Sequence, residues 1–374
     1  MKALILSCNT GQGHNAAGKA LYEVLQARGV PCEIKDTLTF GKEKTSSKVS
    51  GTYVRVTTKA PAVFGAAYQA GAAVSAMLRH THIKSPVYLA NKKYAEALHA
   101  YIVENGIDTV LCPHLFPAQA LTSLRKKYGD FVTFYGVSTD YACTPFWEEC
   151  SPHAVFVPHA DILPEFVRKG MPVTQLVPTG IPVSTRFCVH TPQAEARRRL
   201  KLPQQGEIFL VMTGSMGYGD IITLVDRLAA GSSPTARVLV LTGNNQPLRR
   251  RIVTAFAADK RVQALPFTND VPLYMDACTV LLTKPGGLST TEAAVKNVPM
   301  VHTAPIPGCE TMNARFYAAR GLSIATHSEA QSAAEAIGLA RNAAAQQAMM
   351  AAQKATINAH AAEDICSYIM EHAR

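Results

Sequence analysis

A histidine and two glycines follow the first apolar run of the chain. Residues 3–7 have the pattern of a buried strand, and Gly11, Gly13 and His14 follow just before a helical pattern begins. Glycines let the backbone approach a ligand, and the free N–H groups at a helix start favour an anion or an oxyanion. The positive end of the helix dipole favours the neutral form of His14, whose imidazole could then accept the proton of an incoming hydroxyl. His14 is therefore the candidate catalytic base, and a histidine that only caps or packs is the competing interpretation.

A second loop whose residues could bind a substrate lies at the end of an apolar run in the other half of the chain. Lys284 and Pro285 are followed by Gly286 and Gly287, then by hydroxyl side chains and by Glu292. The backbone N–H groups of such a loop can hold a diphosphate, and a carboxylate on the next helix can accept both hydroxyls of a ribose. A carboxylate near a helix start also stabilises that helix without any ligand, so both interpretations of Glu292 stay open.

Two further segments carry groups of the same kind. Glu310 and Asn313 follow the proline-rich turn at 305–308, and their side chains suit sugar hydroxyls or an ordinary helix start. Residues 213–217 (Thr-Gly-Ser-Met-Gly) end another apolar run and are a further candidate for a phosphate-binding turn. The joint placement of these segments at the ends of apolar runs, in both halves of the chain, is difficult to explain without a ligand.

Apolar runs of strand length alternate with helical patterns along the chain, which predicts parallel sheets built from βαβ units. Strands are expected in the first half at residues 3–7, 32–36, 109–112, 131–137, 154–157 and 174–177. Helices are expected there near residues 15–28, 89–105, 118–128 and 161–169. Strands are expected in the second half at residues 208–212, 238–241, 262–264, 280–283 and 300–302.

The alternation breaks between Pro182 and Gly206, which indicates a connection between two domains. We therefore expect an N-terminal domain over 1–185, a C-terminal domain over 186–345 and a final helix over 346–374 that closes the structure. Two doubly wound α/β units of this kind bind ligands at the carboxyl ends of their strands and in the cleft that they face.

The composition indicates a basic globular protein with an anionic partner. The chain has 374 residues, a formal charge of +10 and a sequence pI near 9.1. Between Thr37 and Ala95 the only acidic residue is Glu43, against nine lysines and arginines. Anionic lipid, nucleotide phosphates and nucleic acid are candidate partners, and a solvated basic face remains possible. No nucleic-acid-binding motif occurs, so a nucleic-acid partner is not expected.

The cysteines and the chain start indicate a reducing compartment. The nine cysteines form no Cys-x-x-Cys pair, so neither a disulfide framework nor a zinc site is expected. The first residues pass directly into a strand pattern, which is not typical of a signal peptide. We therefore expect a cytoplasmic protein.

Residues 60–78 carry no charge, but their alanines, glycines and polar residues make them too weakly apolar for a membrane span. A helix here would align five residues on one side: Phe64, Tyr68, Gly71, Val74 and Leu78. With basic residues on both flanks, the segment fits a helix that lies on a bilayer surface, and an amphipathic core helix fits equally well.

Taken together, these motifs resemble the processive diacylglycerol glycosyltransferases and the plant monogalactosyldiacylglycerol synthases of glycosyltransferase family 28. The resemblance is most specific between Val271 and Arg320, over the motifs described above. The N-terminal Gly-x-Gly-His, Ser138-Thr139-Asp140 and Thr179-Gly180-Ile181-Pro182 match in the same order. The resemblance is weakest between about residues 37 and 100, where the family has its acceptor-binding segment.

The resemblance implies a GT-B fold of two Rossmann-like domains and an inverting transfer from a UDP-sugar without a metal or another cofactor. No Asp-x-Asp metal motif occurs in the sequence. The family pattern implies that Gly11, Gly13 and Asp140 lie on the acceptor side with His14. It places the ribose at Glu292, the donor sugar at Glu310 and Asn313, and the uracil beside Phe267 and Thr268. The full donor set implied is Gly214, Ser215, Gly217, Phe267, Thr268, Lys284, Gly286, Gly287, Thr290, Glu292, Glu310 and Asn313.

The leading hypothesis is transfer of glucose or galactose from a UDP-sugar to diacylglycerol, at the cytoplasmic surface of the cell membrane. The basic segment favours it, because anionic headgroups attract such segments. Cys309 stands where the lipid enzymes usually carry glutamine, which leaves the donor sugar open. Alternatives are UDP-N-acetylglucosamine transfer to a polyprenyl-linked peptidoglycan precursor, a UDP-sugar epimerase, and a non-catalytic UDP-sugar sensor. An NAD-dependent dehydrogenase would leave the second set of loops unexplained.

Overall fold

The computed structural model describes residues 1–9, 11–41, 51, 56, 60–78, 81, 83–212, 214 and 219–372. It divides into two compact units, each with its own parallel sheet. The N-terminal unit comprises Met1–Thr185, Pro307–Cys309 and Asn358–Arg374. The C-terminal unit comprises Arg186–Ile306 and Glu310–Ile357.

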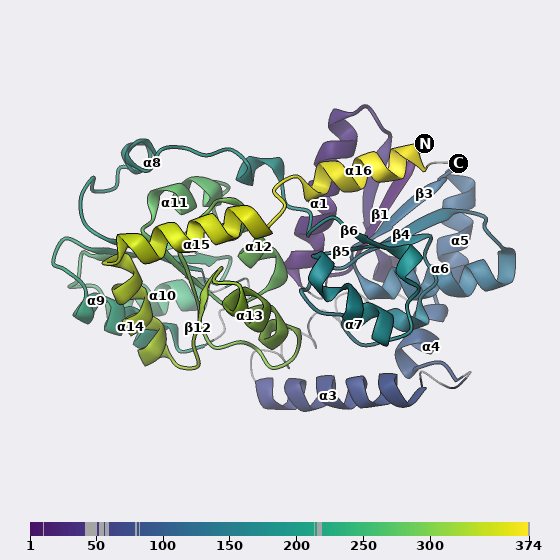
Figure 1. The fold of residues 1–374 in the computed structure, drawn as a ribbon, viewed down its shortest axis with the longest axis horizontal. Coiled ribbons are helices and arrows are strands. Elements are labelled where there is room, and N and C mark those ends of the chain that lie inside the picture. Colours follow the sequence, from purple (N-terminus) through teal and green to yellow (C-terminus); the bar gives the residue numbers. More distant parts are fainter. Residues whose placement is uncertain are drawn as a thin grey trace. The chain divides into compact units, whose positions relative to one another are not determined.

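The N-terminal unit contains a six-stranded sheet in the order β2-β1-β3-β4-β5-β6 (Figure 1). Its strands are β1 (Ala3–Ser7), β2 (Cys32–Asp36), β3 (Thr109–Cys112), β4 (Thr133–Val137), β5 (Ala154–Val157) and β6 (Leu176–Pro178). Its helices are α1 (Gln12–Ala27), α3 (Pro61–Leu78), α4 (Pro86–Lys92), α5 (Ala95–Glu104), α6 (Leu115–Tyr128), α7 (Leu163–Arg168) and α16 (Ala361–Glu371). The chain leaves β1 toward β2 and later returns to β3 on the other side of β1. The loops after β1 and β3 therefore flank the topological switch point, where doubly wound folds bind ligands.

The C-terminal unit repeats the architecture with the order β12-β11-β10-β7-β8-β9. Its strands are β7 (Ile208–Met212), β8 (Arg237–Gly243), β9 (Val262–Pro266), β10 (Val280–Thr283), β11 (Met300–His302) and β12 (Ile324–Ala325). Its helices are α8 (Gln193–Arg199), α9 (Ile221–Gly231), α10 (Gln246–Ala255), α11 (Val271–Ala277), α12 (Gly287–Val295), α13 (Cys309–Ala319), α14 (Glu329–Ala340) and α15 (Ala343–Thr356). Here the switch point lies between β7 and β10, so the loops after these two strands share one edge.

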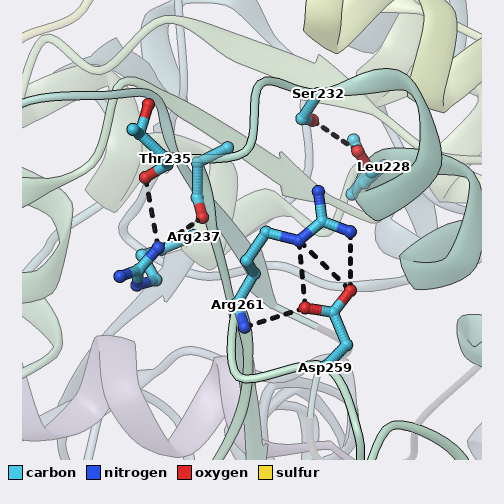
Figure 2. Close-up of polar contacts among 7 residues, drawn as sticks. Leu228, Ser232, Thr235, Arg237, Asp259 and Arg261 are labelled. Carbon is cyan, nitrogen blue, oxygen red and sulfur yellow. Dashed lines mark hydrogen bonds and ion pairs between the residues drawn. The ribbon is translucent and has the colours of Figure 1, made fainter.

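Local polar contacts fix the amino-terminal side of β8 and β9 (Figure 2). Arg261 donates from Nε and Nη2 to the carboxylate of Asp259, with a shortest distance of 2.7 Å. Nη1 of Arg237 donates to the carbonyl oxygen of Thr235 at 3.2 Å, and the Ser232 hydroxyl donates to the carbonyl oxygen of Leu228. These contacts stabilise the turns that lead into the strands, at the edge of the sheet opposite to the loops after β7 and β10.

Two helices differ from the sequence prediction. The helix expected over 89–105 is two helices, α4 and α5, because the chain turns at Lys93 and Tyr94. The single helix expected over 346–374 is also divided. Ile357 has an extended backbone and ends α15, and Nδ2 of Asn358 then donates to the carbonyl oxygen of Thr179 at 2.7 Å.

The last helix, α16, therefore packs in the N-terminal unit, beside α1 (Figure 1). Its residues Ile365, Cys366 and Ile369 are fully buried in the core that Ile5 and Leu21 also form. The C-terminal segment completes the hydrophobic core of the N-terminal unit, although the chain has by then built the whole of the C-terminal unit.

Residues 60–78 form the helix that the sequence predicts, since α3 spans Pro61–Leu78. The five residues predicted to share one side are each half-buried, and Gly65 and Ser75 beside them are buried. Its other side is exposed and uncharged, with Val63 and Met77 61% and 68% accessible. Among the described helices, none has the length and apolar character that crossing a membrane requires.

Candidate active site

His14 lies in the first turn of α1, where the chain leaves the end of β1. Its Nδ1 is 2.9 Å from the carbonyl oxygen of Pro113 and 2.9 Å from Oγ1 of Thr139. A carbonyl oxygen can only accept a hydrogen bond, so Nδ1 carries the hydrogen. In the neutral ring Nε2 then carries the lone pair, which is the tautomer that a general base needs.

The surroundings of His14 act on its pKa in two directions, and burial has the larger effect. Burial lowers the pKa of His14 below its usual value, while the negative charge of Asp140 and the hydrogen bond to Pro113 act in the opposite direction. The ring of His114 meets His14 edge-on, with a centroid distance of 4.5 Å. Burial and the charge of His14 lower the pKa of His114 well below its usual value, so His114 stays neutral beside it.

A cavity of about 300 Å³ opens beside His14 within the N-terminal unit. Its polar wall contains His14, Thr139 and Asp140. Most of the rest is apolar, and the side chains that give it this character are Phe64 and Tyr68 of α3, Leu115, Phe116, Phe146 and Trp147. The cavity therefore joins a candidate base to an apolar compartment.

The loop that carries the aromatic wall is tightly held. Phe146 has a φ of 73°, which a residue with a side chain adopts only when its surroundings impose it. Its ring lies against Gly71 of α3, where a Cβ would stand 3.6 Å from the ring. Trp147 is 4% accessible and packs on Gly136 of β4, where a Cβ would meet its ring at 2.7 Å. Gly136 leaves the room that the Trp147 ring occupies, whereas a Cβ on Gly71 would make an ordinary contact with Phe146.

The other acceptor-side residues of the sequence prediction lie near His14. Gly11 precedes α1 and Gly13 lies in its first turn. A Cβ on Gly11 would meet nothing within 4 Å, and its φ of 176° is extended, so neither packing nor backbone conformation requires glycine there. An open backbone at a helix start is suited to a ligand.

In the C-terminal unit, the residues around Lys284 converge at the switch point. Nζ of Lys284 donates a hydrogen bond to Oε1 of Glu310, and Oε2 of Glu310 accepts a hydrogen bond from the backbone N–H of Ile306 at 2.9 Å. Nδ2 of Asn313 donates to the carbonyl oxygen of Pro285 at 3.0 Å. Glu310 and Asn313 thus connect α13 to the loops after β10 and β11.

The candidate diphosphate site is described in part. Gly286 immediately precedes α12 and Gly287 is its first residue, so both lie at the helix start as predicted. Gly214 follows β7 with a φ of +66°. Ser215 and Gly217, which the resemblance adds to this site, lie outside the described residues.

The candidate ribose and uracil residues have different surroundings. Burial raises the pKa of the Glu292 carboxyl to about 8, and the positive charge of Arg186 acts in the opposite direction. Phe267 is 62% accessible after β9, and Oγ1 of Thr268 accepts the N–H of Asp270 at 3.0 Å. An exposed ring held by such a turn can stack on a base. Arg186 also donates to the carbonyl oxygen of Asn269 at 3.4 Å, in the same loop.

Thr290 lies in α12 with its side chain fully buried, and Oγ1 has no hydrogen-bond partner within the described part of the chain. The helical repeat turns this side chain toward the protein interior, and its role in donor binding stays a prediction. Asn313 is also fully buried, and its Nδ2 donates to the backbone of the loop after β10.

Sequence reasoning missed several residues around His14. Thr139 belongs to a matched motif but was given no role, and Pro113, His114 and Phe146 were not singled out. Their relation to His14 depends on separations such as the 125 residues to Thr139, which no local pattern reveals. Across the described ranges, no cluster of three or more His, Cys, Asp or Glu side chains is arranged to hold a metal ion.

Two parallel doubly wound units of this kind define the GT-B class of glycosyltransferase fold. The structure is similar to that of MurG from Acinetobacter baumannii, with a TM-score of 0.64 over 99% of each chain and 13% identity. At this identity the likeness concerns the fold, and it confirms the fold class expected from the sequence.

Proteins of similar sequence show which glycosyltransferases the chain resembles. Residues 14–183 match the family model described as monogalactosyldiacylglycerol (MGDG) synthase. A processive diacylglycerol beta-glucosyltransferase from Staphylococcus epidermidis is 24% identical over 55% of this chain and 53% of its own length. One from Bacillus cytotoxicus is 23% identical over 88% of this chain and 83% of its own length. The predicted resemblance to these glycosyltransferases is confirmed, although the chain spans about half the length of the first of these relatives.

Proposed function

We propose that this protein is a glycosyltransferase that moves a hexose from UDP-glucose or UDP-galactose to a diacylglycerol-type lipid. The observation that carries the proposal is the tautomer and position of His14, whose ring borders an apolar cavity. The resemblance of residues 14–183 to monogalactosyldiacylglycerol synthase supports a glycolipid product.

His14 serves as the general base in this proposal. As the acceptor oxygen bonds to the anomeric carbon, its proton passes to Nε2 of His14. The bond from that carbon to the diphosphate oxygen breaks at the same time, and UDP leaves with the electron pair. A single displacement of this kind inverts the anomeric configuration. The charge of Asp140 stabilises the imidazolium that forms, since it raises the pKa of His14.

The acceptor is a lipid because the cavity beside His14 is largely apolar. Its aromatic wall suits the glycerol backbone and the first part of an acyl chain, and the polar wall suits a free hydroxyl. A nucleotide-activated sugar alone would not require such walls.

The lipid reaches the cavity from a membrane surface. Helix α3 lines the cavity with Phe64 and Tyr68 and exposes Val63 and Met77 on its other side. An uncharged helix face of this kind can rest in the interfacial region of a bilayer. Lysines nearby in the sequence, such as Lys84, favour an anionic surface. We therefore propose peripheral association with the cytoplasmic side of the cell membrane.

The C-terminal unit binds the UDP-sugar in this proposal. Phe267 stacks on the uracil and Glu292 accepts the ribose hydroxyls, while Glu310 accepts those of the sugar. The N–H group of Gly287 at the start of α12, together with the helix dipole, balances the charge of the leaving diphosphate. No metal ion is needed for that step.

The test is an assay with three labelled donors: UDP-glucose, UDP-galactose and UDP-N-acetylglucosamine. Each is incubated with the protein and diacylglycerol in anionic vesicles. Labelled glycolipid from a hexose donor supports the proposal and identifies the sugar. Tight UDP binding without glycolipid contradicts it. Transfer from UDP-N-acetylglucosamine to a polyprenyl-linked acceptor would then show the alternative transferase, and epimerisation without an acceptor would show the epimerase.

A flotation assay tests the membrane part separately. The protein is expected to float with vesicles that contain anionic lipid, and Val63→Asp with Met77→Asp is expected to reduce the floated fraction. Equal flotation of both proteins would exclude α3 as the contact.

A further inference from the structure

Lys284 runs between two glycines to reach Glu310. A Cβ on Gly214 would stand 2.9 Å from Cε of Lys284, which is closer than a real Cβ contact. A Cβ on Gly286 would stand 3.4 Å from Nζ of Lys284 and 3.9 Å from Oε1 of Glu310. The two glycines therefore border the lysine side chain along its length.

The backbone of Gly286 does not explain why this residue is glycine. Its φ of −76° and ψ of 138° are extended values that any residue adopts. A Cβ on Gly286 would make only ordinary contacts with Nζ of Lys284 and Oε1 of Glu310, so the ion pair does not require glycine there. Gly214 differs, because a Cβ there would press on Cε of Lys284, although its φ of +66° favours glycine in any event.

The carboxylate of Glu310 is fixed at both oxygens. Oε1 meets Nζ of Lys284, and Oε2 accepts the N–H of Ile306 at 2.9 Å. The side chains of Lys284 and Glu310 are 17% and 10% accessible, so the pair is shielded without being closed off. Each carboxylate oxygen has two lone pairs, and capacity remains to accept hydroxyl groups.

We infer that Lys284 is a positioning residue for the donor sugar: it holds Glu310 in the orientation that accepts the sugar hydroxyls. The inference rests on the proposed function, because it takes Glu310 as the residue that contacts the sugar. It assigns Lys284 to the sugar rather than to the diphosphate, although a lysine in a glycine-rich loop is the usual partner of a phosphate.

Binding of UDP and of UDP-glucose, measured by calorimetry without an acceptor, separates these roles. Lys284→Met should weaken UDP-glucose binding by about tenfold, the size of one charge-assisted hydrogen bond, with UDP affinity unchanged within about twofold. Glu310→Gln should give the same pattern, and the double variant should lose no more than the larger single loss. Lys284→Arg should restore part of the affinity, and Lys260→Met, which changes an exposed lysine of the same unit, is the matched control.

Gly286→Ala is a further control, because it adds one methyl group beside the ion pair and removes no charge. The added Cβ would make only ordinary contacts, so UDP-glucose affinity should stay within about twofold of the wild-type value. Unchanged unfolding midpoints show that each variant is folded before its affinity is compared.

Equal losses of UDP and UDP-glucose affinity in Lys284→Met would overturn the inference and make Lys284 a diphosphate ligand. Unchanged affinities for both would also overturn it. If the wild-type protein binds neither UDP nor UDP-glucose, the proposed function fails and the inference falls with it. The two failures are thus distinguishable in the same titrations.

Discussion

Two lysine–carboxylate pairs lie in the C-terminal unit, at opposite edges of one sheet. Lys284 follows β10 at the carboxyl edge and meets Glu310, whereas Lys296 ends α12 at the amino edge and meets Asp276 at 2.6 Å. Side-chain accessibilities are 17% and 10% in the first pair but 0% and 6% in the second. We call the Lys284 pair the open pair and the Lys296 pair the closed pair, because Lys284 is partly accessible and Lys296 is fully buried, although both carboxylates are largely buried.

The closed pair is satisfied by the chain that surrounds it. Nζ of Lys296 also donates to the carbonyl oxygen of Val189, and Oδ2 of Asp276 accepts the N–H of Thr191 at 3.1 Å. This pair fastens residues 189–191, which belong to the connection between the domains, to α11 and α12, so its role is structural. The open pair has glycines beside it and retains acceptor capacity, which suits a ligand. The comparison teaches that accessibility and the edge of the sheet, rather than the residue types, separate the two roles.

Removal of Lys296 should give the largest effect. Lys296→Met leaves Asp276 buried without its partner, so the free energy of unfolding should fall by about 3–5 kcal/mol. Urea unfolding of the full chain measures the loss, and UDP affinity of the protein that remains folded should be unchanged. Lys296→Met combined with Asp276→Leu should regain most of the stability. A loss no larger than that of a surface lysine would show that the pair is not structural.

The pH dependence of UDP binding tests the proposed role of Glu292 in binding the ribose. Burial raises the pKa of Glu292 to about 8, so its carboxyl gains charge, and acceptor strength for the ribose, as the pH rises through that value. UDP affinity should therefore increase by about threefold to tenfold between pH 7 and pH 9, within the limit of tenfold per unit for one proton. Glu292→Gln should abolish the increase, and Arg186→Gln should move it to higher pH.

The raised pKa of Glu292 also makes the free energy of unfolding depend on pH. A carboxyl with a pKa higher in the folded than in the unfolded state binds its proton more tightly when folded. The Glu292 contribution to the free energy of unfolding should therefore decline as the pH rises from 4.5 toward 8. An affinity that is flat with pH, with a stability that is also flat, would contradict the environment described for Glu292.

The smallest expected effect is that of Lys284 on stability. Because Lys284 is partly accessible and Glu310 keeps its hydrogen bond from the N–H of Ile306, Lys284→Met should lower the free energy of unfolding by only about 1–3 kcal/mol, less than Lys296→Met does. Urea unfolding beside Lys296→Met, under one set of conditions, gives the contrast directly. Comparable losses for the two variants would remove the distinction between the two edges.

The sequence predicts the fold better than the site. Alternation of apolar runs and helical patterns places both parallel sheets, because strand periodicity is a local property. It fails where tertiary packing decides, as in the turn at Tyr94 that divides one expected helix, and in α16, whose Ile365 and Ile369 belong to the N-terminal core.

Residue types at strand ends indicate Glu292, Glu310 and Gly286 without any structure. They do not reveal that Thr290 is turned inward, which a helix start read from sequence cannot specify. Nor do they reveal the contact of Nδ1 of His14 with Pro113, because strand order, and not sequence proximity, brings the loops after β1 and β3 together. The tautomer of His14 could therefore be assigned only from the structure.

The most direct test of the central claim is the rate of glycolipid formation by His14→Gln, measured beside its affinity for UDP. The account predicts a rate at least about a hundredfold below that of the wild-type protein, the usual contribution of a general base, with unchanged UDP affinity. A variant that forms glycolipid at the wild-type rate would contradict the account and remove His14 from the mechanism.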